Sequence, residues 1–270
     1  MVASIVISSV MMSGIKVIGL RIPLTEILLV RQLTVTLILM YLFRGNLRRA
    51  LRTSHLGLQV MRGLFSFGSQ LTQFLALLYI PLAEVTALGF SQVIFVTIAA
   101  AVILRETIGW RRWAATIVGF AGVLVMLRPA GEGLNVFALL AMSSGLLSCG
   151  VTITIRSMAR TETTATIMLY QSLMLCAAFL IPAALWWETP TPKECAVLLL
   201  IGLVGSMGQY FFTSACQTGE AGALAPLEFT RLLVAAGIGY FFFLEIPSFS
   251  VLAGASIVIA CTIYTVRRNA

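Results

Sequence analysis

Apolar runs, each about the length of one membrane crossing, follow one another along the chain and are separated by short polar stretches. A membrane-spanning helix needs about 20 predominantly apolar residues. The pattern therefore predicts an all-α polytopic membrane protein with ten transmembrane helices. The predicted spans are residues 2–19, 25–43, 56–78, 84–104, 111–128, 134–155, 163–186, 195–216, 221–243 and 248–266.

The composition supports this fold class and excludes several functions. Only 10% of the 270 residues are charged, against about 25% in a soluble domain. The chain carries one histidine, His55, and no Cys-x-x-Cys pair, so a Cys/His metal centre lacks its ligands. No Gly-x-x-x-x-Gly-Lys-Ser/Thr loop is present to hold nucleotide phosphates. We therefore predict no metal, no cofactor and no catalytic residue, and a protein that is not an enzyme.

The basic residues predict how the chain lies in the membrane. The net charge of +8 falls mostly in short loops, where Lys and Arg set orientation and do not point to nucleic acid. With the N-terminus in the cytoplasm, eleven basic residues lie in inside loops and three, Arg21, Arg128 and Lys193, in outside loops. Because cytoplasmic loops carry the excess of Lys and Arg, both termini are predicted to be cytoplasmic.

The third predicted span has a polar face. Arg62, Ser66, Ser69, Gln70 and Gln73 share one side of the helix. Glutamine at mid-membrane depth is costly unless it meets water or a polar partner. Two interpretations therefore stay open, a face that lines a cavity and a face that hydrogen-bonds to a neighbouring helix. For Arg62 a further alternative is that its side chain snorkels to the cytoplasmic interface.

The ninth predicted span combines a proline, Pro226, with two charged residues, Glu228 and Arg231. A charged residue within a span costs roughly 2.5–3.5 kcal/mol on insertion scales, so it marks a functional site by default. Proline frees backbone groups, which is tolerated beside a water-filled cavity. We predict that Arg231 binds a polar or anionic substrate group while Glu228 holds it or exchanges a proton. The alternative is an i,i+3 ion pair that only fixes the fold.

An offset of 139 residues superposes the two halves of the chain. It places Gln70 on Gln209 and Gln92 on Arg231, inside apolar spans in each case. Each half has five spans, so the second half lies upside down relative to the first. Inverted repeats are typical of secondary transporters, which bind substrate near the midplane at the repeat interface. The predicted repeats are residues 1–129 and 134–270.

Several passages resemble the drug/metabolite transporter superfamily, EamA type, over nearly the full length. In the first half they are Ile80 to Leu88, Leu104-Arg105-Glu106, Gly109 to Trp113 and Val118 to Val123; in the second half they are Gly208-Gln209-Tyr210, Leu224 to Phe229 and Leu244-Glu245. The resemblance implies a ten-helix carrier of two inverted repeats with a central cavity and alternating access. The Gln-Tyr and Ala-Pro-Leu-Glu-Phe passages are similar to the branch that contains riboflavin and S-adenosylmethionine carriers. The first span is shorter than in the family, where that helix usually starts earlier. A late start codon or a missing N-terminal stretch would explain this difference.

We predict that the protein is a secondary active transporter of a small polar metabolite. It is expected to lie in the lipid bilayer, to bind no nucleic acid, and to be a monomer or a homodimer. The alternative is a channel or a structural membrane protein without coupled transport. The resemblance implies a bacterial inner-membrane location. An excess of Arg over Glu within the spans favours a carboxylate or phosphate on the substrate. The candidate substrate-binding residues are Arg31, Gln70, Gln73, Gln92, Gln209, Tyr210, Glu228 and Arg231.

Overall fold

The structure is a computed structural model of the whole chain. It describes residues 2–19, 21–45, 51–89, 91–102, 136–218, 234–244 and 249–267, together with isolated positions between 114 and 125. Every regular element within these residues is an α-helix. The described part of the chain therefore agrees with the predicted all-α fold class.

The chain divides into two compact units that do not follow the order of the sequence. Unit 1 consists chiefly of Ala3–Phe67 and Thr154–Thr218, and unit 2 of Gly68–Ile153 and Gly219–Ala270. Each unit thus combines segments from both halves of the chain. Two long helices, α4 and α8, pass from one unit into the other.

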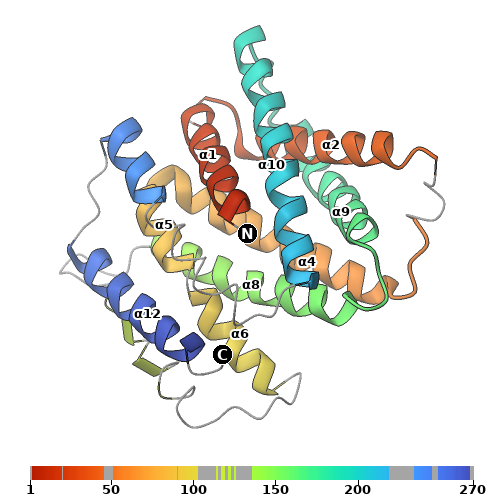
Figure 1. Cartoon of the computed structure of the whole chain (residues 1–270). Helices are drawn as coiled ribbons and strands as arrows, with labels where there is room; N and C mark the ends of the chain where they lie inside the picture. The colour runs from red at the N-terminus through yellow and green to blue at the C-terminus, as the bar shows by residue number, and fades with distance from the viewer. Residues whose placement is uncertain are drawn as a thin grey trace. The chain divides into compact units, whose positions relative to one another are not determined.

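Unit 1 is a bundle in which α2 is the central helix. Its members are α1 (Val2–Ile18), α2 (Leu24–Leu42), the first half of α4 (Leu56–Tyr79), the end of α8 (Val136–Met158), α9 (Thr164–Leu185) and α10 (Pro192–Thr218). Figure 1 shows α2, α9 and α10 close together, and α2 packs against both of the others. Apolar side chains from α2 and α9 form the core at this contact: Val35, Leu39, Met168 and Leu169.

Unit 2 holds the remainder of α4 and α8 with the short helices α5 (Leu82–Gly89) and α6 (Ser91–Val102), the segment Val234–Phe243 and α12 (Phe249–Arg267). The predicted span 84–104 corresponds to α5 and α6, and residue 90 between them lies outside the described residues. Gly145 of α8 lies where α5 ends and α6 begins. A Cβ at Gly145 would clash with Oγ of Ser91 and lie 3.1 Å from the backbone nitrogen of Gln92, so a side chain here would displace its neighbours.

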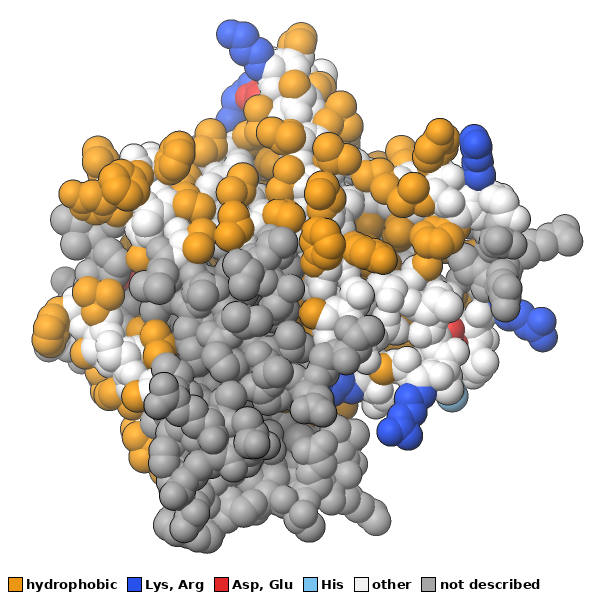
Figure 2. Space-filling view, in the orientation of Figure 1, with side chains coloured by type: hydrophobic (Ala, Val, Ile, Leu, Met, Phe, Trp, Pro, Cys, Tyr) orange, Lys and Arg blue, Asp and Glu red, His pale blue; other side chains and the backbone are white. Residues whose placement is uncertain are grey.

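Among the described residues, four helices are long and apolar enough to cross a membrane, namely Leu24–Leu42, Val136–Met158, Thr164–Leu185 and Pro192–Gln217. Large apolar side chains on them are exposed, among them Leu37 at 65% and Leu199 at 58%. Figure 2 shows hydrophobic side chains crowding the visible surface over α1, α2 and α10, with Lys and Arg at its edges. Such a wide apolar surface on a single chain fits contact with lipid.

The ends of the helices agree closely with several predicted spans. The predicted ranges 25–43, 56–78 and 163–186 correspond to α2, α4 and α9. Most of the predicted span 111–128 and the first part of 221–243 lie outside the described residues. The count of ten transmembrane helices therefore stays a prediction.

Candidate functional site

Arg31 is buried in the middle of unit 1 and bonds to a helix from the other half of the chain. Only 6% of Arg31 is exposed. Its Nη2 donates to Oε1 of Gln209 on α10, at 3.5 Å. Gly205, one turn earlier on α10, lies so close that an added Cβ would be 3.1 Å from Nε of Arg31. The structure thus brings together two of the predicted site residues, Arg31 and Gln209.

Arg62 is a second buried arginine in the same unit. It is 1% exposed, and its Nη1 donates to the backbone oxygen of Ile167 on α9 at 2.7 Å. A snorkelling side chain would reach water at the membrane surface, whereas this one turns inward. The interpretation that Arg62 snorkels to the interface is therefore wrong.

Further buried polar side chains lie in unit 1, and of these only Ser66 belongs to the polar face that the sequence predicted. Gln59 and Ser66 of α4, Gln171 of α9 and Thr213 of α10 are all at most 5% exposed. Each has at least one buried side-chain atom without a hydrogen-bond partner in the described structure. Gln171 carried a signal in the sequence, because the 139-residue offset places it on Gln32, another buried glutamine.

Unit 2 contains a polar cluster of a different kind, in which α8 is the common partner. Gln92 of α6 donates through Nε2 to Oγ1 of Thr152 at 3.0 Å and to the backbone oxygen of Ser148 at 3.5 Å. The hydroxyl of Ser69 on α4 lies 2.6 Å from that of Ser148. For Ser69, these contacts agree with the second interpretation of the polar face of α4, in which it hydrogen-bonds to a neighbouring helix.

The α8 partners in unit 2 have counterparts on α1. The 139-residue offset places Ser148 on Ser9 and Thr152 on Ser13. The hydroxyl of Thr152 donates to the backbone oxygen of Ser148 at 3.1 Å, and that of Ser13 donates to the backbone oxygen of Ser9 at 2.9 Å. The pair Ser9 and Ser13 on α1 therefore has the same local hydrogen bonding as the pair Ser148 and Thr152 on α8.

The remaining predicted site residues are placed less centrally or lie outside the described residues. Gln70 and Gln73 of α4 are half-buried. Tyr210 is 48% exposed, and its ring meets that of the next residue, Phe211, edge-on. Glu228 and Arg231 lie outside the described residues.

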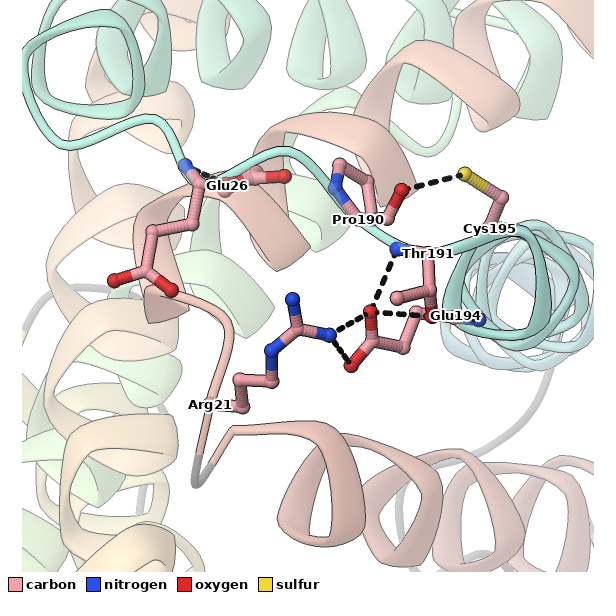
Figure 3. A network of polar contacts seen from close by, with 7 residues as sticks. Arg21, Glu26, Pro190, Thr191, Glu194 and Cys195 are labelled. Atoms are coloured by element: carbon pink, nitrogen blue, oxygen red, sulfur yellow. Dashed lines mark hydrogen bonds and ion pairs between the residues drawn. The ribbon is translucent and has the colours of Figure 1, made fainter.

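Polar contacts also fasten the ends of the helices in unit 1. Figure 3 shows Arg21, in the loop between α1 and α2, paired with the carboxylate of Glu194 in the first turn of α10. The backbone nitrogen of Thr191 donates to Oε2 of Glu194 at 2.7 Å, and the Thr191 hydroxyl oxygen accepts from the backbone nitrogen of Glu194 at 3.4 Å. This reciprocal arrangement is a capping box, and Pro192 occupies the first helical position, where proline is favoured.

Two buried acids serve as local hydrogen-bond acceptors. Glu26 of α2 is fully buried and accepts through Oε2 from the backbone nitrogen of Glu188 at 3.1 Å. Glu162, before α9, accepts through Oε1 from the hydroxyl of Thr53 at 2.7 Å and from the backbone nitrogen of Ser54 at 2.8 Å. Both acids hold loops, and neither was selected from the sequence.

In the described part of the chain, no group of three His, Cys, Asp or Glu side chains could hold a metal ion. The candidate site is a set of buried arginines, amides and hydroxyls on helices from both halves. Such groups bind and orient polar molecules within an apolar bundle.

The comparison with protein families decides the class of this molecule. The EamA-like transporter family matches the chain twice, over residues 1–128 and 136–267. The chain belongs to the EamA-like transporter family. Like other members it is a transporter, and its apolar helices fit a membrane protein.

Bacterial relatives of this EamA-like transporter carry several substrate names. An S-adenosylmethionine uptake transporter of Rickettsia felis is 30% identical over 255 residues, covering 93% of this chain and 85% of the relative. A riboflavin transporter of Brucella anthropi is 30% identical over 230 residues, covering 82% and 80%. A pseudopaline exporter of Pseudomonas aeruginosa is 28% identical over 259 residues, covering 94% and 90%. The relatives thus include the two kinds of carrier that the sequence passages resemble.

A solved crystal structure shares the fold of the EamA-like transporter. The TM-score is 0.67 at 15% sequence identity, and the match covers 99% of this chain and 98% of the other. At this identity the likeness concerns the fold alone.

Proposed function

We propose that the chain is a secondary active transporter for the uptake of S-adenosylmethionine across a bacterial inner membrane. The observation that carries this proposal is the contact between Arg31 and Gln209. It joins α2 of the first half to α10 of the second half, deep inside an apolar bundle. A buried polar contact between halves is what a binding site at a repeat interface requires.

The choice of substrate rests on the relatives together with the charge of the site. S-adenosylmethionine uptake transporters are similar to this chain over most of its length. Arg31 and Arg62 are buried, and guanidinium groups recognise carboxylates. S-adenosylmethionine carries a carboxylate, whereas riboflavin does not. The relative named as a riboflavin transporter makes riboflavin the comparison substrate in any test.

The mechanism we propose is alternating access between two inverted repeats, residues 1–129 and 134–270, around a central cavity. The match of the family to each half of the chain supports the repeats. The excess of Lys and Arg in one set of loops supports cytoplasmic termini. The protein is proposed to work as a monomer or homodimer.

The substrate site is proposed to include Arg31 and Gln209 with the predicted pair Glu228 and Arg231, where Arg231 binds a polar or anionic group. The remaining predicted contacts with substrate are those of Gln70, Gln73 and Tyr210. Gln92 was also predicted to bind substrate, but because its side chain bonds to α8 we propose that it serves helix packing instead.

Uptake by the purified protein in proteoliposomes tests this function. We expect saturable uptake of radiolabelled S-adenosylmethionine, accelerated by unlabelled S-adenosylmethionine inside the vesicles, because a carrier exchanges its substrate across the membrane. Uptake that never saturates and shows no such counterflow would instead support the channel alternative. Saturable uptake of riboflavin without uptake of S-adenosylmethionine would assign the other substrate.

A further inference from the structure

One face of α4 in unit 1 gathers buried polar side chains that the fold leaves without partners. Gln59, Arg62 and Ser66 stand at positions i, i+3 and i+7, which share one side of a helix. They are 1%, 1% and 2% exposed. Both polar atoms of the Gln59 side chain, Nε of Arg62 and Oγ of Ser66 have no hydrogen-bond partner in the described structure. Buried polar atoms without partners destabilise a fold, so this face is suited to bind a polar ligand.

The N-terminal half of α9 lies against this face and adds another amide. Arg62 bonds to the backbone oxygen of Ile167, and a Cβ added at Gly63 would lie 3.2 Å from Cβ of Met174. Gln171 stands between Ile167 and Met174 on the same side of α9, at spacings of four and three residues. It is 5% exposed, and its Oε1 has no partner among the described residues. Gln171 therefore faces the same region as Arg62.

The end of α10 adds a hydroxyl at the same level. Gln217 accepts a hydrogen bond from the Thr164 hydroxyl and donates to the backbone oxygen of Glu162 at 3.0 Å, so α10 ends where α9 begins. Thr213 stands one turn before Gln217 on the same side of α10. It is fully buried, and its Oγ1 has no partner in the described part of the chain.

None of the described acids of unit 1 forms an ion pair with Arg62, and Glu26, Glu162 and Glu194 have other hydrogen-bond donors. Glu26 accepts from the backbone of Glu188, whose own side chain is exposed. Glu162 accepts from Thr53 and Ser54, and Glu194 pairs with Arg21. No described carboxylate pairs with Arg62. A buried guanidinium without a counter-charge is expensive, and an anionic ligand would relieve that cost.

We infer that Arg62, Gln59, Ser66, Gln171 and Thr213 form a subsite for the zwitterionic α-amino-acid end of the transported substrate. The guanidinium and the hydroxyls donate to the carboxylate. The unpartnered amide oxygens of Gln59 and Gln171 accept from the ammonium group beside it. The assignment rests on the proposed function, since S-adenosylmethionine has such an end and riboflavin has none.

Competition in wild-type proteoliposomes tests the subsite without any substitution. The probe is decarboxylated S-adenosylmethionine, which keeps the ammonium group and lacks only the carboxylate. Loss of charged hydrogen bonds worth 1.5–3 kcal/mol corresponds to roughly 10- to 100-fold weaker competition against labelled S-adenosylmethionine. Equal competition by both compounds would overturn the subsite. A wild-type protein that takes up no S-adenosylmethionine would refute the proposed function itself, and the subsite with it.

Gln59→Glu tests whether the residues of this subsite bind the carboxylate of the substrate. A glutamate three residues before Arg62 would pair with the guanidinium, so the protein should keep its melting temperature while the subsite becomes occupied by its own carboxylate. We expect the KM for S-adenosylmethionine to rise at least tenfold and the preference over the decarboxylated compound to disappear. Gln59→Met is the neutral control of similar size, and it should raise KM only a few-fold and keep the preference. If Arg62 only ties α4 to α9, Gln59→Glu will transport with an unchanged KM and an unchanged preference, and the inference fails.

Discussion

The two compact units bury polar side chains in opposite ways. In unit 2, Gln92 and Ser69 find their partners on α8, and the groups involved are neutral. In unit 1, Arg62 carries a charge, and buried atoms of Gln59 and Gln171 have no partner in the described structure. A neutral, bonded cluster stabilises helix contacts, whereas a charged cluster with free donors and acceptors is suited to bind a ligand.

The energetics of membrane proteins explain why this difference matters. Interhelical hydrogen bonds in a membrane contribute on average about 0.6 kcal/mol each, so the cluster of unit 2 is a modest source of stability. A charged side chain in a span costs several times more, roughly 2.5–3.5 kcal/mol. We therefore expect that Arg31 and Arg62, which this fold keeps buried, serve a function other than packing.

The largest effect is expected from Arg31→Gln. The substitution keeps a hydrogen-bonding side chain facing Gln209 but removes the buried charge. Because one charged contact with substrate is worth about 1.5–3 kcal/mol, kcat/KM for uptake should fall roughly 10- to 100-fold. The melting temperature should change little. Normal uptake by a well-folded Arg31→Gln protein would remove Arg31 from the site.

The second prediction concerns Gly205, which lets Arg31 approach α10. In Gly205→Ala the new Cβ would lie 2.8 Å from Sδ of Met11 and 3.1 Å from Nε of Arg31, so both side chains must shift. Small displacements of binding groups lower transport, and we expect a loss of about three- to tenfold in uptake. Gly57→Ala is the matched control because a Cβ there meets nothing within 4 Å. If both variants transport equally well, the close packing at Gly205 does not position Arg31.

Gln92→Leu tests whether the polar cluster of unit 2 contributes to stability and not to substrate binding. It removes the hydrogen bond to Thr152, and thermal unfolding should report a loss of about 1 kcal/mol. The KM for S-adenosylmethionine should stay near the wild-type value if the contact is one of packing. A rise in KM comparable to that of Arg31→Gln would show that Gln92 contributes to substrate binding, as its repeat pairing with Arg231 predicts.

The smallest effect is expected at the helix ends, where the contacts are exposed. Thr191→Ala removes the N-cap hydroxyl of α10, and loss of a cap costs about 1 kcal/mol or less at such a position. Uptake by this variant should equal that of the wild type at temperatures below its melting transition. A specific loss of uptake without a loss of stability would assign the contact between Arg21 and Glu194 a part in transport.

Much of the fold could be predicted from the sequence because membrane spans are long and uniform. The ends of α2, α4 and α9 agree with the apolar runs, since polar residues mark where each run leaves the membrane. The mixing of both halves in each compact unit could not be predicted in this way. It depends on contacts between distant helices, such as α2 with α9 and α10, which no local pattern encodes.

The candidate site was predictable in part for similar reasons. Arg31 and Gln209 were selected because polar residues are conspicuous in the middle of apolar spans, and the structure joins them. Gln59 and Glu26 were missed because they stand near the start of a span, where polar residues are ordinary. The hydrogen-bond partner of Arg62 could not be predicted either, because it is a backbone oxygen, which every residue carries.

The most direct test of the central claim is the equilibrium affinity of purified protein for radiolabelled S-adenosylmethionine in two double variants. Arg31→Gln with Arg62→Gln removes the buried charges of unit 1, and Ser69→Ala with Gln92→Leu removes the neutral cluster of unit 2. We predict that the first pair raises Kd by at least 100-fold, whereas the second binds within a few-fold of the wild type. The reverse order, or equal losses in both, would contradict the assignment of binding to unit 1.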